Sequence, residues 1–129
     1  MRQIVRYLQR QEFAAGEYLM RQGHESDDLF FIESGQVTSR IENPGQPPMR
    51  LETMCGGRTV GEMGFYLNAP RSAAVIADEA SVTYRLSRDA LKRMELEEPQ
   101  AALAFHRLMV QLLGDRASHL MRTVQALQR

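Results

Sequence analysis

Between residues 13 and 87 the sequence is a succession of short extended runs, each of strand length and each followed by turn residues. Glycine, proline and asparagine gather most densely at 43–48, where Asn-Pro-Gly-Gln-Pro-Pro predicts a hairpin loop. Many short strands separated by frequent turns indicate a closed or two-sheet β-roll, of which the jelly roll is the nearest common form. The expected strands span residues 18–20, 29–32, 36–41, 49–54, 73–77 and 82–86.

The two ends of the chain have helical patterns instead. The first residues carry Ile4, Val5 and Leu8 at the spacing of a short amphipathic helix. Ser87 is typical of a helix N-cap, and residues 101–127 repeat apolar side chains at helical spacing. We therefore expect a single domain over 1–129, mainly β with flanking helices: an N-terminal helix over 1–12, a jelly-roll-like β-roll over 13–87 and two C-terminal helices over 88–129.

The last helical pattern is too long for a domain of this size. At about 1.5 Å per residue it would span about 40 Å, which is longer than a small β-barrel. We expect its far end to pack on a second copy of the chain, forming a homodimer, or on another domain. Its apolar stripe comprises Leu108, Met109, Leu112, Leu113, Leu120, Met121, Val124 and Leu127.

Composition argues against several classes of function. The 129 residues include sixteen basic and sixteen acidic side chains, and this zero net charge argues against binding to nucleic acid or to a membrane surface. The single cysteine, Cys55, cannot form an internal disulfide and fits a reducing cytosol. No apolar run is long enough to cross a bilayer, and the N-terminus lacks the apolar segment of a signal peptide. These features predict a cytoplasmic location.

The stretch 60–73 holds the residues with the clearest chemistry. Gly61 and Gly64 permit close backbone approach and positive φ. The amides after Gly61 would begin a short helix, and free N–H groups there favour an anion. Arg71 adds a planar fork suited to two phosphate oxygens, while Glu62 can accept a hydrogen bond from a sugar hydroxyl. The alternative is a solvated ion pair between Glu62 and Arg71, with glycines that serve only as turn residues.

The same stretch resembles the phosphate-binding cassette of cyclic nucleotide-binding domains. Gly61-Glu62 and Pro70-Arg71-Ser72-Ala73 match the family pattern at the family's spacing, whereas Val60 stands where the family often has an aromatic residue. The likeness covers nearly the whole chain, because similar residues also occur at Ala15-Gly16-Glu17, Gln22-Gly23, Phe30-Phe31-Ile32-Glu33-Ser34-Gly35 and Gly57.

The resemblance implies a role for each part of the cassette. Glu62 would bind the ribose 2′-hydroxyl, Arg71 would bind the cyclic phosphate, and backbone amides with the Ser72 hydroxyl would complete the cradle. In the family a hydroxyl residue after the arginine can favour guanine, whereas alanine goes with adenine. Ser72 is compatible with either, and we expect cyclic AMP ahead of cyclic GMP. The predicted phosphate site comprises Gly61, Glu62, Met63, Gly64, Arg71, Ser72 and Ala73.

The base would lie between a strand and the last helix. We expect Met54 and Val37 to line the base side of the pocket, although ordinary core packing explains them equally well. In the family the last helix folds over the purine as a lid, and Arg116, Ala117 and His119 lie about where such contacts occur. Arg116 could stack on the purine or bond to it; the alternative is a solvated surface arginine.

The residues suggest a binding module and no enzyme. The sequence indicates no nucleophile–base pair and no histidine or cysteine spacing suited to a metal, so we expect no cofactor beyond a cyclic AMP or cyclic GMP ligand. Binding would pass to an attached effector through movement of the last helix. The alternative is a docking or dimerisation module that works without nucleotide. A narrower likeness, over 61–73, 77–79 and 84–87, is to the domain appended to some bacterial SulP-type anion permeases, which would make the effector a membrane transporter.

Overall fold

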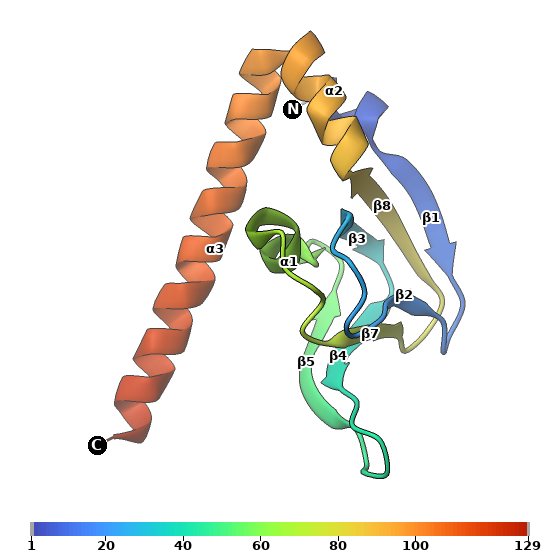
Figure 1. Ribbon diagram of the computed structural model, residues 1–129, viewed down its shortest axis with the longest axis vertical. Coiled ribbons are helices and arrows are strands. Elements are labelled where there is room, and N and C mark those ends of the chain that lie inside the picture. The colour runs from blue at the N-terminus through green and yellow to red at the C-terminus, as the bar shows by residue number, and fades with distance from the viewer. Residues whose placement is uncertain (1, 129) are drawn as a thin grey trace.

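Two four-stranded antiparallel sheets face each other in the computed structural model, and the C-terminal helices lie at one end of them and along one side (Figure 1). The structure describes residues 2–128; Met1 and Arg129, the outermost residues of the predicted domain, lie outside this range. In chain order the elements are η1 (Arg2–Tyr7, a 3-10 helix), β1 (Gln9–Phe13), β2 (Tyr18–Met20), β3 (Asp28–Ser34), β4 (Gln36–Ile41), β5 (Met49–Cys55), β6 (Thr59–Val60), α1 (Glu62–Leu67), β7 (Ala74–Ala77), β8 (Ser81–Ser87), α2 (Arg88–Glu97) and α3 (Pro99–Leu127).

The sheets follow the order β1-β8-β3-β6 and β2-β7-β4-β5, so strands distant in sequence pair with each other. β4 and β5 form the predicted hairpin, with Val37 opposite Met54. Inward-facing apolar side chains from both sheets fill the space between them, as expected for a two-layer β fold. This core contains Phe13, Leu19, Met20, Phe30, Ile32, Val37, Met54, Val60, Val75 and Ala77. The predicted mainly-β class with flanking helices is confirmed.

The N-terminal segment differs from the prediction. The predicted helix over 1–12 is wrong from Gln9 onward, because η1 ends at Tyr7 and residues 9–13 form strand β1. All five residues of β1 pair with β8, from Gln9 opposite Arg85 to Phe13 opposite Ser81. Backbone pairing with β8 and burial of Phe13 therefore outweigh the weak helical pattern, and the β-roll begins at Gln9.

The C-terminal helices begin as predicted, or close to it. The Ser87 hydroxyl caps α2 by accepting a hydrogen bond from the Ala90 amide at 3.1 Å. Pro99 occupies the first turn of α3, where its missing N–H costs nothing. Both helices pack with η1 and α1 over a second apolar core. That core contains Ile4, Tyr7, Leu29, Phe65, Leu86, Leu91, Met94, Ala102, Phe105 and Met109.

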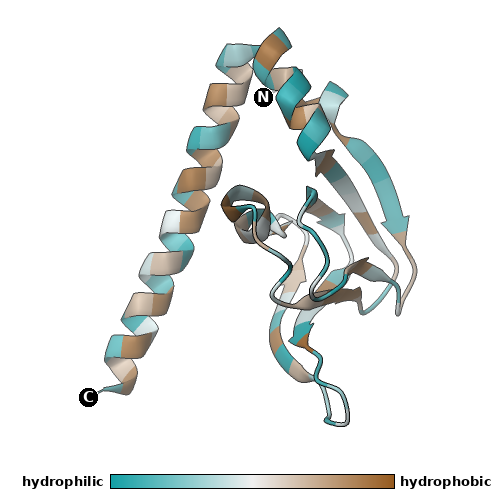
Figure 2. Ribbon diagram, viewed as in Figure 1, coloured by the Kyte–Doolittle hydropathy of each residue, from teal (hydrophilic) through white to brown (hydrophobic). Residues whose placement is uncertain are grey.

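The predicted apolar stripe of α3 is only partly the face that packs on the domain. Ala102, Phe105 and Met109 are buried, and of these the stripe contained only Met109. Apolar residues nevertheless continue along the helix to its C-terminal end (Figure 2). Leu108, Leu120, Met121, Val124 and Leu127 are exposed. Across residues 2–128, no helix is both long enough and apolar enough to cross a membrane.

Candidate functional site

The loop before α1 depends on a glycine. Gly61 has φ +85°, in the left-handed region that disfavours side chains. A Cβ at this position would lie 2.6 Å from Arg71 Nη1 and 2.7 Å from Met20 Cε. α1 then ends at Asn68, whose φ of 53° is also left-handed, and Pro70 follows shortly after. This short helix between two left-handed residues leads the chain directly from Glu62 to Arg71.

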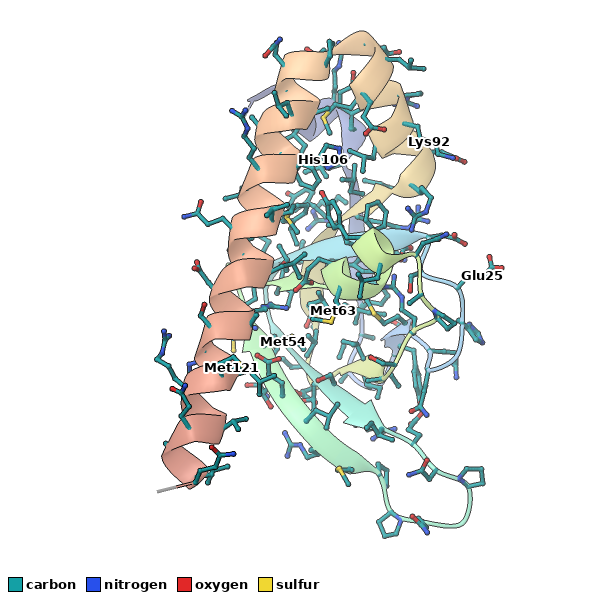
Figure 3. The ribbon with its side chains drawn as sticks, turned by 60° about the vertical axis from the view of Figure 1, so that its left-hand side comes forward. Glu25, Met54, Met63, Lys92, His106 and Met121 are labelled. Atoms are coloured by element: carbon teal, nitrogen blue, oxygen red, sulfur yellow. The ribbon has the colours of Figure 1, made fainter. Side chains whose placement is uncertain are left out.

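A cavity of about 300 Å³ lies between the cassette, strands β4 and β5, and α3. Its volume is at the lower end of the range typical of small-ligand sites. Figure 3 shows Met54 and Met63 in the region between the sheets and α3. The residues that line the cavity are Met20, Ser39, Leu51, Glu52, Met54, Val60, Gly61, Glu62, Met63, Gly64, Leu67, Ala69, Pro70, Arg71, Ser72, Ala73, Val75 and Arg116.

Arg71 is fixed at one side of this cavity by the protein itself. Its Nη1 donates to the Gly61 carbonyl at 2.8 Å, and its Nη2 donates to Asp28 Oδ1 at 2.7 Å. The other Asp28 oxygen accepts from Arg85 Nε at 2.6 Å, so one carboxylate holds two arginines. Burial lowers the pKa of Arg71, and the negative charge of Asp28 opposes that shift. Because an arginine side chain stays protonated in proteins, a buried positive charge remains at the cavity wall.

Glu62 is the buried acidic group of the cavity and is 1% exposed. Its Oε1 accepts a hydrogen bond from Nη1 of Arg116, a residue of α3. The second Arg116 nitrogen, Nη2, donates to the Thr59 carbonyl at 3.1 Å. Burial lowers the pKa of Arg116, and the neighbouring positive charge of Arg58 adds to this effect. α3 therefore contacts the cassette through the ion pair between the Arg116 guanidinium and the Glu62 carboxylate.

Two buried polar atoms at the cavity lack a hydrogen-bond partner within residues 2–128: Glu62 Oε2 and Arg71 Nε. Such atoms are rare in folded proteins, and at a cavity they are available to a ligand or to water; Arg88 Nε and Glu98 Oε2, outside the cavity lining, also lack a hydrogen-bond partner within this range. In this ion-pair network three guanidinium groups, from Arg71, Arg85 and Arg116, face only two carboxylates, from Asp28 and Glu62. Arg85 and Asp28 lie outside the cavity lining; within it, the charges of Arg71 and Arg116 are balanced by those of Glu62 and Glu52. The site therefore offers a buried guanidinium beside an unpaired acceptor, which suits an anion that also carries a hydroxyl.

The structure brings together nine of the ten predicted site residues. Gly61, Glu62, Met63, Gly64, Arg71, Ser72, Ala73, Met54 and Arg116 all line the cavity. Val37 does not line it: this residue is fully buried in the core between the sheets, opposite Met54, which corrects its predicted position. Of the other two positions suggested for the lid, Ala117 and His119 are exposed and also lie outside the cavity lining.

Several cavity residues were missed. Ser39 and Glu52 line the wall formed by β4 and β5. Side chains alternate along a strand, so Glu52 shares a face with the predicted Met54, and Ser39 shares a face with Val37; this period of two was the available signal. Asp28 has no such local signal, because it lies 43 residues before Arg71 in a polar stretch that suggested only a loop.

Comparisons with known proteins agree with this geometry. The chain is 29% identical over 94 residues to a cAMP-dependent protein kinase regulatory subunit of Blastocladiella emersonii, covering 73% of this chain and 23% of that protein. A solved cyclic nucleotide-binding domain from Methylobacillus flagellatus matches 92% of this chain and 66% of its own chain, with 26% identity and a TM-score of 0.83. The regulatory domain of Toxoplasma gondii PKA with cAMP matches 90% of this chain and 41% of its own, with 27% identity and a TM-score of 0.69.

The family match covers the β-roll, the cassette and α2. This chain spans less than a quarter of the curated kinase subunit, so it corresponds to one part of a larger relative. The family model for the cyclic nucleotide-binding domain matches residues 10–97, well over half of the sequence. The chain therefore belongs to the cyclic nucleotide-binding domain family.

Proposed function

We propose that this chain is a regulatory module that binds a cyclic nucleotide, cyclic AMP ahead of cyclic GMP, and has no catalytic activity of its own. The main support for this proposal is that Arg71 and Glu62 line the same cavity. Each has a buried polar atom that lacks a partner within the described chain. The phosphodiester would take the Arg71 side of the cavity, and the ribose 2′-hydroxyl would donate to Glu62. Each ligand group thereby meets a protein group of complementary charge or hydrogen-bonding capacity.

The expected affinity is modest. Cyclic AMP has about 22 non-hydrogen atoms, and at about 0.3 kcal/mol each these contribute about 6–7 kcal/mol. That free energy corresponds to a dissociation constant on the order of ten micromolar. The buried arginine and carboxylate are already oriented, which reduces the entropy lost on binding.

The effect of nucleotide binding would be transmitted to the effector through α3. Arg116 holds Glu62 from this helix, and Glu62 is the proposed ribose acceptor. A nucleotide that binds more tightly when α3 is in one position than when it is in another shifts the helix toward the favoured position. This difference in affinity moves the effector. The effector is a further part of a longer protein or an associated protein in the cytosol. The likeness to the domain of SulP-type permeases stays a prediction, in which the effector is a membrane anion transporter.

A second function, docking or dimerisation without nucleotide, is favoured by a specific observation. The protein's own groups already occupy both charged ends of the site: Asp28 and the Gly61 carbonyl hold Arg71, and Arg116 holds Glu62. In this alternative the cavity keeps its shape for stability alone, and no nucleotide competes with these internal partners.

Thermal unfolding with and without nucleotide separates the two functions. Cyclic AMP at about 100 times its dissociation constant is expected to add about 2.7 kcal/mol to the free energy of unfolding. Competition between cyclic AMP and cyclic GMP in the same assay then ranks the two ligands, and cyclic AMP is expected to bind more tightly. An unchanged melting temperature at millimolar concentrations of both nucleotides would leave only the docking function.

Dimerisation through α3 is compatible with either function. The exposed residues Val110, Leu120, Val124 and Leu127 belong to a series that also includes Leu113 and Ala117. The series has alternating spacings of three and four residues, the pattern of a coiled-coil seam. Leucine occupies every second position of the series, and the positions between are Val110, Ala117 and Val124; β-branched valine combined with leucine in this way favours a two-stranded parallel coiled coil. We propose that a second copy of the chain covers this seam.

The mass in solution tests the dimer. Sedimentation velocity is expected to give about twice the 14.7 kDa of one chain. Leu120→Glu is expected to produce the monomer, because it introduces a charge into the seam. Leu108→Glu is the matched control, since Leu108 is an exposed leucine of the same helix outside the series. A monomeric wild-type chain at the highest attainable concentration would contradict the dimer.

A further inference from the structure

A polar chain of three side chains joins the cassette helix to both C-terminal helices. The Tyr66 hydroxyl on α1 lies 2.9 Å from Nδ1 of His106 on α3. His106 Nε2 lies 3.0 Å from Oε2 of Glu95 on α2. Figure 3 shows His106 on the first half of α3, well separated along the helix from Met121. None of these three residues lines the cavity, so these hydrogen-bonded side chains support the site from outside it.

Glu95 fixes the direction of both hydrogen bonds. An ionised carboxylate can only accept, so Nε2 of His106 must carry the proton that it donates to Glu95. In neutral His106 this leaves Nδ1 without a proton, and Nδ1 therefore accepts from the Tyr66 hydroxyl. Burial raises the pKa of Tyr66, and the negative charge of Glu95 adds to the shift. Tyr66 thus remains a neutral phenol with a hydrogen to donate.

The position of α1 depends on tertiary contacts of this kind. A helix of six residues is too short to be stable by itself. Glu62 and Tyr66 are four residues apart, so they lie on the same face of α1. α3 meets that face twice, through Arg116 at Glu62 and through His106 at Tyr66. The Tyr66–His106 bond therefore restricts rotation of α1 about its axis and, with it, the direction of the Glu62 carboxylate.

We propose that Tyr66 and His106 are positioning residues for Glu62, and that they hold it for the ligand only while His106 is neutral. A second proton on the imidazole converts Nδ1 from an acceptor into a donor. The Tyr66 hydroxyl must then accept, and its own half-buried hydrogen loses its partner. At the same time the charged imidazole pairs more strongly with Glu95, so protonation favours the α2–α3 contact over the α1–α3 contact. The inference rests on the proposed nucleotide-binding function.

The surroundings of His106 contain few other charges. Tyr66 faces it from α1 and Glu95 faces it from α2. On α3 itself the residues one turn away are all apolar: Ala102, Leu103, Met109 and Val110. Arg107 is its charged neighbour in sequence and is exposed. Within the described part of the chain, Glu95 is the one charged side chain that forms a hydrogen bond or ion pair with the imidazole.

Two substitutions of His106 test its hydrogen bonds to Tyr66 and Glu95 separately. In His106→Asn the amide oxygen can take the place of Nδ1 and accept from Tyr66, and it never becomes charged. In His106→Gln the amide reaches the position of Nε2, toward Glu95, but offers Tyr66 no acceptor. At pH 8 we expect cyclic AMP affinity close to wild type for His106→Asn. His106→Gln and Tyr66→Phe are each expected to bind about fivefold more weakly, the effect of one hydrogen bond. Equal affinities for all three variants would overturn the proposal.

The pH profile supplies a readout that simple destabilisation would not alter. Neutral His106 is the competent form, so cyclic AMP affinity is compared between pH 8 and pH 5, and acidification is expected to weaken binding. Wild type is expected to lose about fivefold more affinity over this range than His106→Asn. The control His119→Asn removes an exposed histidine of the same helix and should keep the wild-type profile. A pH profile of His106→Asn that matches wild type would overturn the proposal.

A measurement without nucleotide distinguishes failure of this inference from failure of the proposed function. Nitrogen NMR of the imidazole at pH 8 is expected to show His106 with its proton on Nε2 and with Nδ1 as a hydrogen-bond acceptor. A proton on Nδ1 instead would overturn the inference even in a chain that binds cyclic AMP. Wild type that binds no cyclic AMP, yet has the expected tautomer, would contradict the proposed function and, with it, the positioning role.

Discussion

The two halves of α3 lie in opposite environments. In the first half, Ala102, Phe105 and Met109 are each at most 2% exposed and pack into the core shared with α2 and η1. In the second half, from Gly114 onward, every residue with a described side chain is exposed except Arg116. Figure 1 shows the same contrast, since the helix leaves the other helices and runs along one side of the β-roll without joining it.

This difference indicates which part of the molecule can respond to a ligand. Buried apolar packing holds the first half against the domain. The second half contacts the site through Arg116, a partly exposed side chain that an incoming ligand could displace or reinforce. Segments with few buried contacts open at low free energy and commonly provide the moving parts of a regulatory protein. In the proposed function the β-roll would recognise the ligand, and the second half of α3 would transmit its binding.

The largest expected effect comes from removing the anchor of the first half. Phe105 is fully buried and lies edge-on to Phe31, with ring centroids 6.2 Å apart. Phe105→Ala is expected to lower the free energy of unfolding by about 3–5 kcal/mol, because it leaves a cavity in the core. Chemical denaturation measures this change. Leu108→Ala, on the exposed side of the same half, is expected to cost about 0.5 kcal/mol or less; similar losses for the two variants would break the contrast between the faces.

A smaller effect is expected at the contact between the second half and the site. Arg116→Ala leaves the buried Glu62 carboxylate without its guanidinium and is expected to cost about 1–3 kcal/mol of unfolding free energy. The lower part of this range applies if cavity water solvates Glu62. Adding Glu62→Gln should recover part of the loss, because the carboxamide carries no charge. The exposed Arg122→Ala is the control, expected within about 0.5 kcal/mol of wild type. Identical stabilities for Arg116→Ala and Arg122→Ala would show that the ion pair contributes nothing.

The smallest expected effect is a gain in stability from a substitution at the boundary between the two halves of α3. Gly114 is exposed, and a Cβ added to it would meet nothing within 4 Å. Gly114→Ala is therefore expected to stabilise the helix by about 1 kcal/mol, since alanine loses less backbone entropy than glycine. Thermal unfolding measures the gain. A loss of stability would show that the helix needs the freedom of glycine at this boundary.

Most of the fold could be predicted, because its signals are local. The Asn43–Pro48 loop and the Ser87 cap are local features that the structure confirms. β1 was missed because only Phe13 is buried among its five residues, so its pairing with β8 left no apolar alternation. β6 was missed because it has two residues, Thr59 and Val60, and exists through its pairing with β3.

The site divides in the same way. The cassette is continuous in sequence, so its glycines, Glu62 and Arg71 could be recognised from their spacing and family likeness. Asp28, which holds Arg71, and His106, which holds Tyr66, come from distant elements joined only by folding. No local pattern marks such a pair, since each residue alone resembles an ordinary surface side chain.

The central claim, that Arg71 binds the phosphate of a cyclic nucleotide, is tested by calorimetric titration with two ligands. Adenosine has the base and the ribose 2′-hydroxyl of cyclic AMP without its phosphate. Wild type is expected to bind cyclic AMP at least about 30-fold more tightly than adenosine, a difference of about 2 kcal/mol or more. In Arg71→Ala that difference should largely disappear. Equal loss of affinity for both ligands in Arg71→Ala, or a wild-type chain that binds cyclic AMP no better than adenosine, would contradict it.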